Sequence, residues 1–165
     1  MALFILDSNV FIQAWRLTYP IDVVPNFWKK LRALAQSGHI ISIDKVKDEL
    51  YKNSDGLKTW CMENLPPEFF KDTTEVIEAY IKVSGWISEK QNHYKQAAID
   101  EFLRHDEADA FLVAYTLADR ENRKIVTYEV SSQGRKKVKI SDCAGDLGVD
   151  YMNTIEMFRA LKETF

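Results

Sequence analysis

Short, continuous runs of apolar residues alternate along the chain with longer segments in which apolar residues recur every three or four positions. The first run, ALFIL at residues 2–6, stops at Asp7-Ser8-Asn9 and is typical of a strand buried on both faces that is followed by a helix cap. Similar runs predict strands over residues 39–43, 124–127 and 149–153, and a shorter one over 138–140. Strands that alternate with helices predict an α/β fold with a mainly parallel central sheet, whose functional groups lie at the carboxyl ends of the strands.

The helical segments carry recognisable start and stop signals. Pro25 is expected in the first turn of a helix that Gly38 ends, and Asp44 is expected to be the N-cap of a helix over residues 44–51. Residues 142–148 predict a small helix closed by Gly148. Asn153 and Glu156 have the spacing of a capping box and open the last helix.

Two segments between these elements differ in character. Residues from about 54 to 105 are rich in aromatic residues, Lys and Glu and have helical periodicity broken at Pro66-Pro67, which predicts an insertion of two or three helices whose aromatic side chains pack in the interior. From Ala110 to Ala118 the next segment is apolar nearly all round, so a buried helix is expected, with Asp106 as its N-cap and Asp109 in its first turn.

Composition favours one domain over residues 1–165. Of 165 residues, 46% are hydrophobic, which is enough for a core without crosslinks, and the two cysteines have no metal-ligand spacing. A secretory leader or a membrane span is not predicted, so we expect a cytoplasmic protein with no membrane partner.

The net charge of −3 conceals a basic segment from residue 120 to residue 139. Seven basic and two acidic residues give this segment a net charge of +5, whereas the other 15 basic and 23 acidic residues give −8. Basic residues beside acidic chemistry suit an enzyme that acts on phosphodiesters, although a basic run in a loop is also common as a solvated turn. The residues expected to contact nucleic acid are Arg135, Lys136, Lys137 and Lys139.

Four acidic residues stand out because the predicted sheet brings them toward one edge. Asp7 and Glu129 follow strands, Glu49 lies beside the core face of its helix, and Asp109 precedes a buried helix. For each of them alone, an ordinary role as a helix cap, a salt-bridged residue or an exposed loop residue is the favoured explanation. If the four carboxylates lie together, they repel one another. At a separation of ~4 Å and an effective dielectric near 20, each pair costs about 4 kcal/mol, so the cluster requires a cation. Oxygen ligands favour Mg²⁺ or Mn²⁺, which can activate water for hydrolysis.

Around these acids the chain resembles the PIN-domain nucleases. The segments LDSNVFI, DELY, DEADAFLVAYTLA and Thr127-Tyr128-Glu129 are similar to the four acidic motifs of that family, in the same order, and later segments resemble a bacterial branch akin to VapC toxins. The resemblance covers most of the chain and implies a three-layer α/β/α fold. It also implies a Mg²⁺-dependent or Mn²⁺-dependent endoribonuclease that acts on RNA, an antitoxin protein that blocks the site, and a homodimer.

The resemblance assigns roles to individual residues. Those that would bind metal are Asp7, Glu49, Asp109 and Glu129. Those that would support them by hydrogen bonding are Ser8, Asn9, Thr127 and, in an outer position, Asp106. Where the family commonly has Asp, this chain has the longer Glu129.

Two other functions remain open at this point. Asp7 at the end of a strand is also compatible with phosphoryl transfer through an aspartyl-phosphate, although residue 9 is Asn where dehalogenase-like domains have a second acid. A non-catalytic interaction module is the other alternative, with the acids serving as caps and salt bridges.

Overall fold

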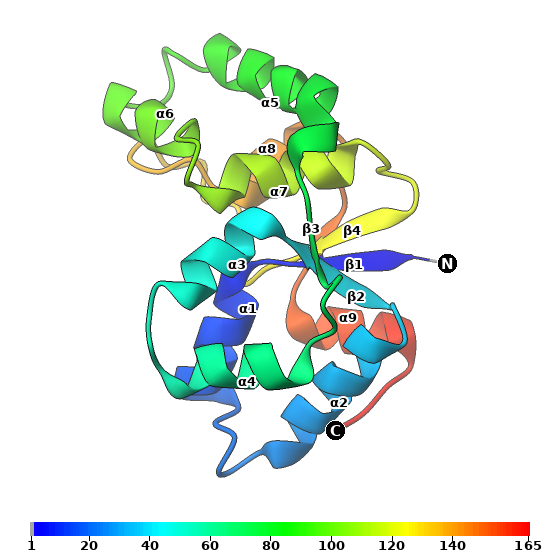
Figure 1. The fold of residues 1–165 in the computed structure, drawn as a ribbon. Helices are drawn as coiled ribbons and strands as arrows, with labels where there is room; N and C mark the ends of the chain where they lie inside the picture. The colour runs from blue at the N-terminus through cyan, green and yellow to red at the C-terminus, as the bar shows by residue number, and fades with distance from the viewer. Residues whose placement is uncertain (1) are drawn as a thin grey trace.

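Five parallel strands form one central sheet in the computed structural model, which describes residues 2–165 (Figure 1). The strand order is β3-β2-β1-β4-β5, so β1 lies in the centre, with Phe4 opposite Ile40 of β2 and Leu6 opposite Val126 of β4. The strands are β1 (Leu3–Leu6), β2 (Ile40–Ile43), β3 (Phe70–Lys71), β4 (Arg123–Val126) and β5 (Tyr151–Met152). The predicted α/β fold with a parallel sheet is confirmed.

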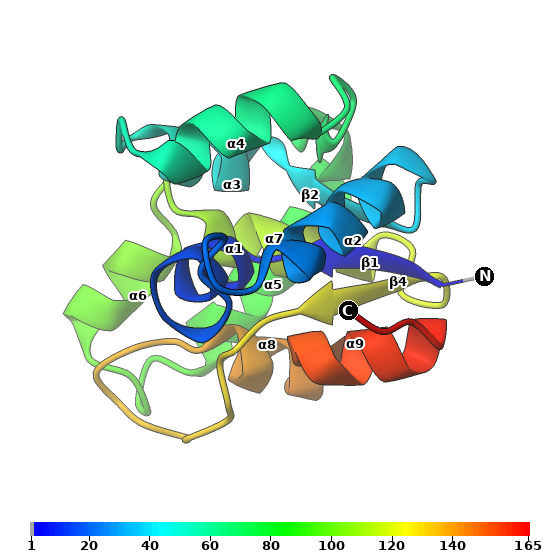
Figure 2. The same ribbon diagram turned by 90° about the horizontal axis from the view of Figure 1, so that it is seen from below.

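Helices cover both faces of this sheet (Figures 1 and 2). On one face α5 packs along α7, and on the opposite face lie α2 and α9. The helices are α1 (Ser8–Gln13), which continues as a π-helical turn (Ala14–Thr18), α2 (Pro25–Gln36), α3 (Asp44–Tyr51), α4 (Gly56–Asn64), α5 (Ile77–Glu89), α6 (Gln96–Phe102), α7 (Ala108–Leu117), α8 (Ile140–Asp146) and α9 (Thr154–Leu161). A short 3-10 turn, Thr74–Val76, precedes α5.

The strands form because they are apolar on both faces. Ile5, Leu6, Ile40 and Val126 are fully buried, as expected for strands that lie between two layers of helices. The apolar residues of α7 close the core on one side, and the aromatic residues of α2 close it on the other. This arrangement fixes β1 and β4 next to each other and therefore fixes where their carboxyl ends meet.

The expected helix signals are largely confirmed. Pro25 begins α2, and Gly38 and Gly148 adopt φ values of 78° and 70°, in the left-handed region that ends helices. Asn153 and Glu156 form the capping box of α9.

The aromatic-rich segment from 54 to 105 contains three α-helices, as predicted, and also strand β3, which was not predicted. Strand β3 is only two residues long and pairs with β2 at the edge of the sheet. The helices of the segment divide between the two faces: Trp60 of α4 packs edge-on against Trp28 of α2, whereas Tyr80 of α5 stacks on Phe111 of α7. The aromatic side chains of this segment therefore pack in the interior, as expected.

Three local predictions are wrong. Helix α3 begins at Asp44 itself, with Ile43 at the N-cap, and the Asp44 carboxylate accepts from both the Lys45 amide and the Thr73 hydroxyl at 2.8 Å, which joins the start of α3 to the segment after β3. Asp106 is not the N-cap of α7, since Glu107 occupies that position and Asp106 pairs with Arg104 on the surface at 3.0 Å.

The predicted strand over 138–140 is also absent from the described residues. Val138 and Ile140 are buried, which explains the apolar signal, but Ile140 begins α8 and its amide bonds to a carboxylate rather than to a neighbouring strand. Alternating burial over three residues is too short to distinguish a strand from an anchored loop.

Within residues 2–165, none of the helices combines the length and the apolar character that crossing a bilayer demands.

Candidate active site

The four predicted acids come from four different elements that meet at the carboxyl edge of the sheet. Asp7 directly follows β1, and Glu129 follows the end of β4. Glu49 lies in α3, the helix after β2, and Asp109 lies in the first turn of α7. Adjacent parallel strands that end at the same level deliver their next residues to one place, as expected for a functional site in an α/β fold.

Asp7 is the most enclosed of these acids, with only 3% of the residue exposed. One carboxylate oxygen, Oδ1, accepts from the Ser8 amide at 2.7 Å and so caps α1. The other, Oδ2, accepts from the Thr127 hydroxyl at 2.9 Å. Burial, together with the negative charges of Glu129 and Glu49, outweighs these hydrogen bonds and raises the pKa of Asp7 to about 7.

Thr127 connects three of the predicted residues. Its hydroxyl donates to Asp7 and accepts from the Asn9 side-chain amide at 3.2 Å and from the Glu129 backbone amide at 3.1 Å. The Asn9 side-chain oxygen in turn accepts from the Tyr128 amide at 3.2 Å. The start of α1 and the end of β4 are therefore fixed to each other through side chains.

Glu49 connects α3 to the other elements of the site. One of its oxygens accepts from the Ser8 hydroxyl at 2.6 Å, and the other accepts from the Ala108 backbone amide at 3.2 Å. The Ala108 amide belongs to the first turn of α7, where backbone amides lack partners within the helix. Glu49 thus holds the start of α7, and with it Asp109, against α1.

Asp109 carries the least compensated charge of the four. Its pKa is raised well above the usual range by burial first and then by the negative charges of Asp7 and Glu129. Within residues 2–165, hydrogen-bond donors reach the carboxylates of Asp7, Glu49 and Glu129 but not that of Asp109. An acid without a donor, buried beside other acids, is favourable only when protonated or bound to a cation.

Glu129 is held at the opposite side of the cluster. It accepts from the Ile140 amide at 2.7 Å and from the Lys137 ammonium at 3.4 Å. Burial opposes the charged form of Lys137, but the attraction of Glu129 and Asp109 outweighs this effect and raises the pKa of Lys137. Lys137 therefore neutralises part of the cluster.

The structure adds an acid that the sequence analysis did not select. Glu107 is the N-cap residue of α7, and its pKa is raised by burial and by the charge of Glu49. The sequence could have suggested Glu107 because it lies two residues before Asp109 in the segment HDEADA. An acid at the start of a helix, however, is usually an ordinary cap. Asp106, which was selected, lies on the surface with Arg104.

The carboxylates of the cluster are the ligand type that a hard divalent cation prefers, although they are not arranged around a single ion position. The four acids offer oxygen ligands, and the pKa values of Asp7 and Asp109 are raised first by desolvation and then by the charges of the neighbouring acids. Among the described residues, however, no three acidic, His or Cys side chains lie close enough together to bind one ion. Binding an ion here therefore requires side chains to turn toward it or water to complete its coordination.

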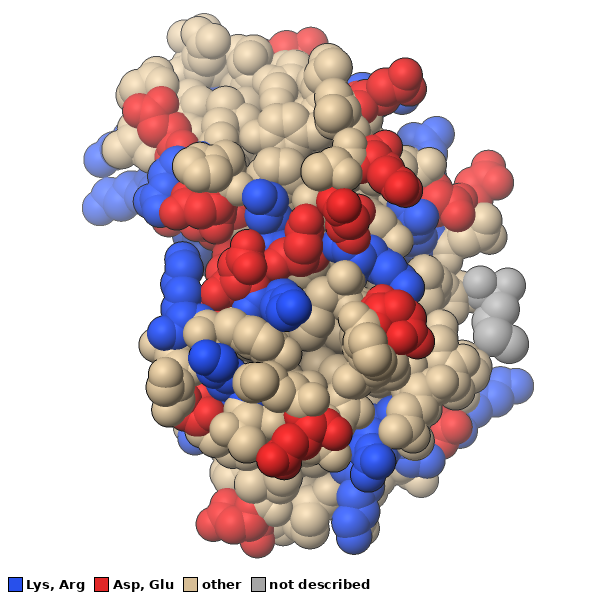
Figure 3. Space-filling view, viewed as in Figure 1, with Lys and Arg blue, Asp and Glu red and all other residues tan. Residues whose placement is uncertain are grey.

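A shallow groove of about 540 Å³ runs beside the acids between α1 and the segment that follows β4. Ser8, Asn9 and Glu129 form its end at the cluster, and Arg16, Lys137 and Lys139 supply positive charge along it. Its apolar lining includes Leu17 and Val130, both more than 70% exposed. Figure 3 shows acidic and basic side chains interspersed along the band where α3 and α7 meet.

The other two basic residues of the predicted nucleic-acid surface differ in environment. Arg135 donates to the His93 carbonyl at 2.9 Å and so fixes the loop to the segment after α5. Lys136 is exposed. Lys137 and Lys139 thus line the groove, whereas Arg135 lies toward α5.

Comparison with known proteins agrees with this architecture. The fold class is the three-layer α/β/α arrangement of PIN-like domains. A chain in the crystal structure of VapBC2 from Rickettsia felis, bound to a DNA fragment from their promoter, superimposes with a TM-score of 0.55 over 92% of this chain and 98% of that chain, at 14% sequence identity. At this identity the likeness shows the fold and not the activity.

The family of this chain follows from its sequence. The family model described as "Domain of unknown function (DUF4411)" matches residues 4–165, and the chain belongs to that family. The curated proteins include no significant match to the sequence.

Proposed function

We propose that the protein is a Mg²⁺-dependent or Mn²⁺-dependent endoribonuclease whose metal-binding acids are Asp7, Glu49, Asp109 and Glu129. The observation that carries the proposal is the pair of enclosed carboxylates, buried Asp7 and half-buried Asp109, whose pKa values are raised by desolvation and by the surrounding acids at the carboxyl edge of the sheet. An arrangement that disfavours its own ionisation is expected where a cation belongs to the working site.

The acids would bind the ion in different ways. Asp109 would hold the ion directly, because within residues 2–165 its carboxylate accepts from no donor, and Asp7 would do so with its remaining lone pairs, because Ser8 and Thr127 fix its position deep in the cluster. Glu129 would act through water, since its oxygens already bond to the Ile140 amide and Lys137. When bound, the ion supplies a polarised phosphate oxygen and a water of lowered pKa.

The groove beside the acids supports a nucleic-acid substrate. Arg16, Lys137 and Lys139 line this groove and would contact the phosphates. The exposed apolar side chains of Leu17 and Val130 offer surface for unstacked bases, which single-stranded RNA presents and a duplex does not. This combination favours RNA over a small phosphate ester.

The proposal is tested by cleavage of a labelled single-stranded RNA with Mn²⁺, with Mg²⁺ and with EDTA. We expect cleavage that requires metal and falls at least 100-fold in Asp7→Asn and Asp109→Asn, because each removes a charged ligand. Asp22→Asn is the matched control, since Asp22 is exposed in the turn before α2 and, within residues 2–165, its side chain forms no hydrogen bond or ion pair with the acids. Cleavage that persists in EDTA and in both active-site variants would refute the proposal.

We further propose that the protein acts as the toxin of a toxin–antitoxin pair. The support is the shared fold with a chain of the VapBC2 structure. Induced expression in a bacterial culture should arrest growth with the wild-type chain and not with Asp109→Asn at equal soluble yield. Equal growth of the two cultures would contradict the toxin role while leaving the nuclease assay to stand on its own.

A further inference from the structure

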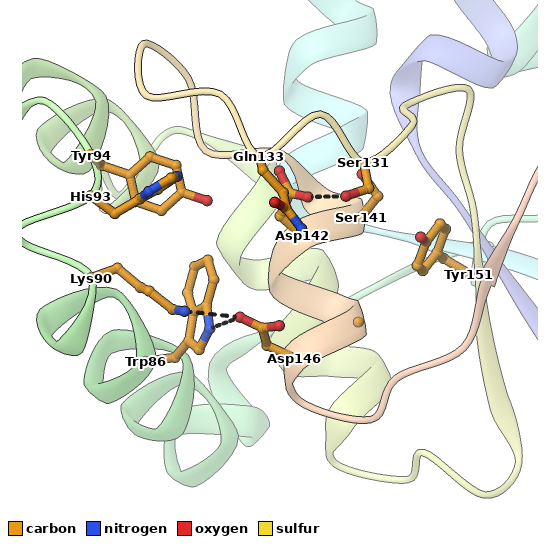
Figure 4. Close-up of a pocket in the computed structure, with 11 residues that line it drawn as sticks. Trp86, Lys90, His93, Tyr94, Ser131, Gln133, Ser141, Asp142, Asp146 and Tyr151 are labelled. Atoms are coloured by element: carbon orange, nitrogen blue, oxygen red, sulfur yellow. Dashed lines mark hydrogen bonds and ion pairs between the residues drawn. The ribbon is translucent and has the colours of Figure 1, made fainter.

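A second cavity, of about 350 Å³, lies between the end of α5 and the first turns of α8 (Figure 4). Trp86, Lys90 and Tyr94 line it from the α5 side. Ser141, Asp142 and Asp146 of α8 line the opposite side, and Ser131 and Gln133 belong to the loop that follows Glu129. We refer to it as the α8 cavity.

One carboxylate of the α8 cavity, that of Asp146, contacts two side chains, one from α5 and one from the residue after it, through a single oxygen, Oδ2. Asp146 accepts from the Trp86 indole at 2.9 Å and pairs with the Lys90 ammonium at 3.4 Å (Figure 4). These contacts position the indole ring at the wall and neutralise the charge of Asp146. The contacts with Trp86 and Lys90 therefore explain the presence of Asp146 in the cavity without a ligand.

The neighbouring residues have unmet hydrogen-bonding capacity. The Ser141 hydroxyl oxygen and Asp142 Oδ2 are both buried, and neither has a hydrogen-bond partner among residues 2–165. Ser141 is only 1% exposed. The other oxygen of Asp142 accepts from the Ser131 hydroxyl, and within residues 2–165 the ion pairs do not include Asp142. Buried polar atoms without partners are uncommon and call for a ligand or a specific role.

The α8 cavity is close to the acidic cluster along the chain. Glu129 accepts from the Ile140 amide at 2.7 Å, and the next two residues, Ser141 and Asp142, line the α8 cavity. The first turn of α8 therefore joins the two sites, since its first residue contacts Glu129 and its next two residues line the α8 cavity. This connection makes a neighbouring nucleotide of the proposed RNA substrate the candidate occupant of the α8 cavity.

We propose that the α8 cavity binds an unstacked guanine base of the substrate. The inference rests on the proposed RNA substrate and names one base that the site recognises. An ionised carboxylate only accepts hydrogen bonds, and the Watson–Crick edge of guanine presents two adjacent donors, N1–H and the N2 amino group. Adenine, cytosine and uracil each present acceptors beside a single donor group. Trp86 and Tyr94 supply aromatic faces or edges for the base.

Entry of the base requires the loop over the α8 cavity to shift, because Asp142 Oδ2 is shielded from solvent. Gln133 of this loop has φ of 51°, a left-handed conformation that is uncommon for residues other than glycine. Residues 131–133 are exposed, so a shift of this loop would leave the core unchanged. The loop is therefore the side of the α8 cavity that would open for the base.

The experiment measures binding of GMP, AMP, CMP and UMP by calorimetry in EDTA, so that cleavage plays no part. We expect GMP to bind at least tenfold more tightly than the other three, and Asp142→Asn to weaken GMP binding at least tenfold. Asp22→Asn is again the matched control and should bind as the wild type does. Thermal melting shows whether Asp142→Asn is folded, and Trp86→Phe, which keeps an aromatic ring, provides a second variant expected to weaken binding.

Each outcome decides the inference separately from the nuclease proposal. Failure of GMP to bind, equal binding of all four nucleotides, or unchanged binding by folded Asp142→Asn would overturn it. Tighter binding of arginine amide than of GMP would also overturn it and indicate a site for a protein side chain. Loss of cleavage in Asp109→Asn with GMP binding retained would show that the two sites act independently.

Discussion

The ammonium group of Lys137 lies 3.4 Å from Glu129 Oε1, so a lysine of the basic loop provides a cation inside the acidic cluster. Asp109 also contributes to the raised pKa of Lys137. The loop thus partly offsets the repulsion that four carboxylates create. A metal ion entering the cluster must compete with this charge.

Replacing Lys137 with Met should therefore strengthen metal binding. Because the Lys137 side chain is half exposed and its charge is screened by water, its loss favours a divalent cation at the acids by only about 1 kcal/mol, which is roughly a fivefold decrease in the Kd for Mn²⁺. Calorimetric titration of Mn²⁺ into the two proteins measures the change directly. RNA affinity should fall in the same variant, because a phosphate contact is lost.

Lys136→Met is the control for this prediction. Lys136 is the neighbouring residue, and ion pairs of residues 2–165 involve Lys137 but not Lys136. Its replacement removes the same formal charge from the same loop. Equal effects of the two substitutions on Mn²⁺ affinity would show that only the general charge of the loop matters and that the Lys137 contact does not.

Thr127→Val should disrupt the site without changing its charge. The Thr127 hydroxyl donates to Asp7 at 2.9 Å and accepts from the Asn9 side chain and the Glu129 amide. Removing it leaves buried polar groups without partners at a cost of about 1–3 kcal/mol, and the pKa of Asp7 should rise further because this hydrogen bond lowers it. Thermal melting should show a loss of roughly 3–10 °C, and Mn²⁺ binding should weaken.

Thr116→Val separates these two effects. Thr116 is also fully buried, but its hydroxyl donates to the Leu112 carbonyl within α7. We expect this variant to lose some stability and to keep the Mn²⁺ affinity of the wild type. If Thr127→Val likewise retained full Mn²⁺ affinity, the position of Asp7 would not depend on Thr127.

The sequence predicted the sheet and the location of the acids because those signals are local. A strand buried on both faces leaves a continuous apolar run, as at Leu3–Leu6, and the polar residue that ends it must lie at the sheet edge. The capping box at Asn153 is equally local. The hydrogen bond between Ser8 and Glu49 depends on how α1 packs against α3. At the sequence level, only the family resemblance assigned both residues to one site.

The sequence could not predict features that depend on long-range partners. Strand β3 has two residues and exists because β2 offers it an edge. Asp106 and Glu107 are adjacent acids before α7, and sequence alone does not show which one caps the helix and which one pairs with Arg104. The contact of Lys137 with Glu129 likewise depends on how the loop returns to α8.

Asn153→Ala should lower stability without affecting the site. The Asn153 side chain accepts from the Glu156 amide at 2.9 Å, and the Glu156 side chain accepts from the Asn153 amide at 2.9 Å. Loss of an N-cap costs about 1 kcal/mol, or roughly 2–4 °C in melting temperature for a chain of this size. The increase in melting temperature on adding Mn²⁺ should equal that of the wild type. A smaller increase would indicate that α9 influences the acids.

Stability without metal should fall as the pH rises from about 4 to about 7. Burial raises the pKa of Asp7 from its ordinary value of 3.8 to about 7, so in this range the folded protein binds a proton that the unfolded chain releases. The stabilising contribution is therefore fully present below pH 4 and is lost as the pH rises through 7. The raised pKa of Asp109 acts in the same direction.

Metal should reverse this dependence, because Mn²⁺ binds the ionised carboxylates and competes with protons. Melting curves between pH 5 and pH 8 should show a Mn²⁺-induced increase that grows with pH. Asp7→Asn has no proton to lose, so in EDTA its melting temperature should depend less on pH and should exceed that of the wild type at pH 8. An identical pH profile in the wild type and in Asp7→Asn would show that Asp7 is ionised throughout this range and that the cluster needs no cation to remain charged.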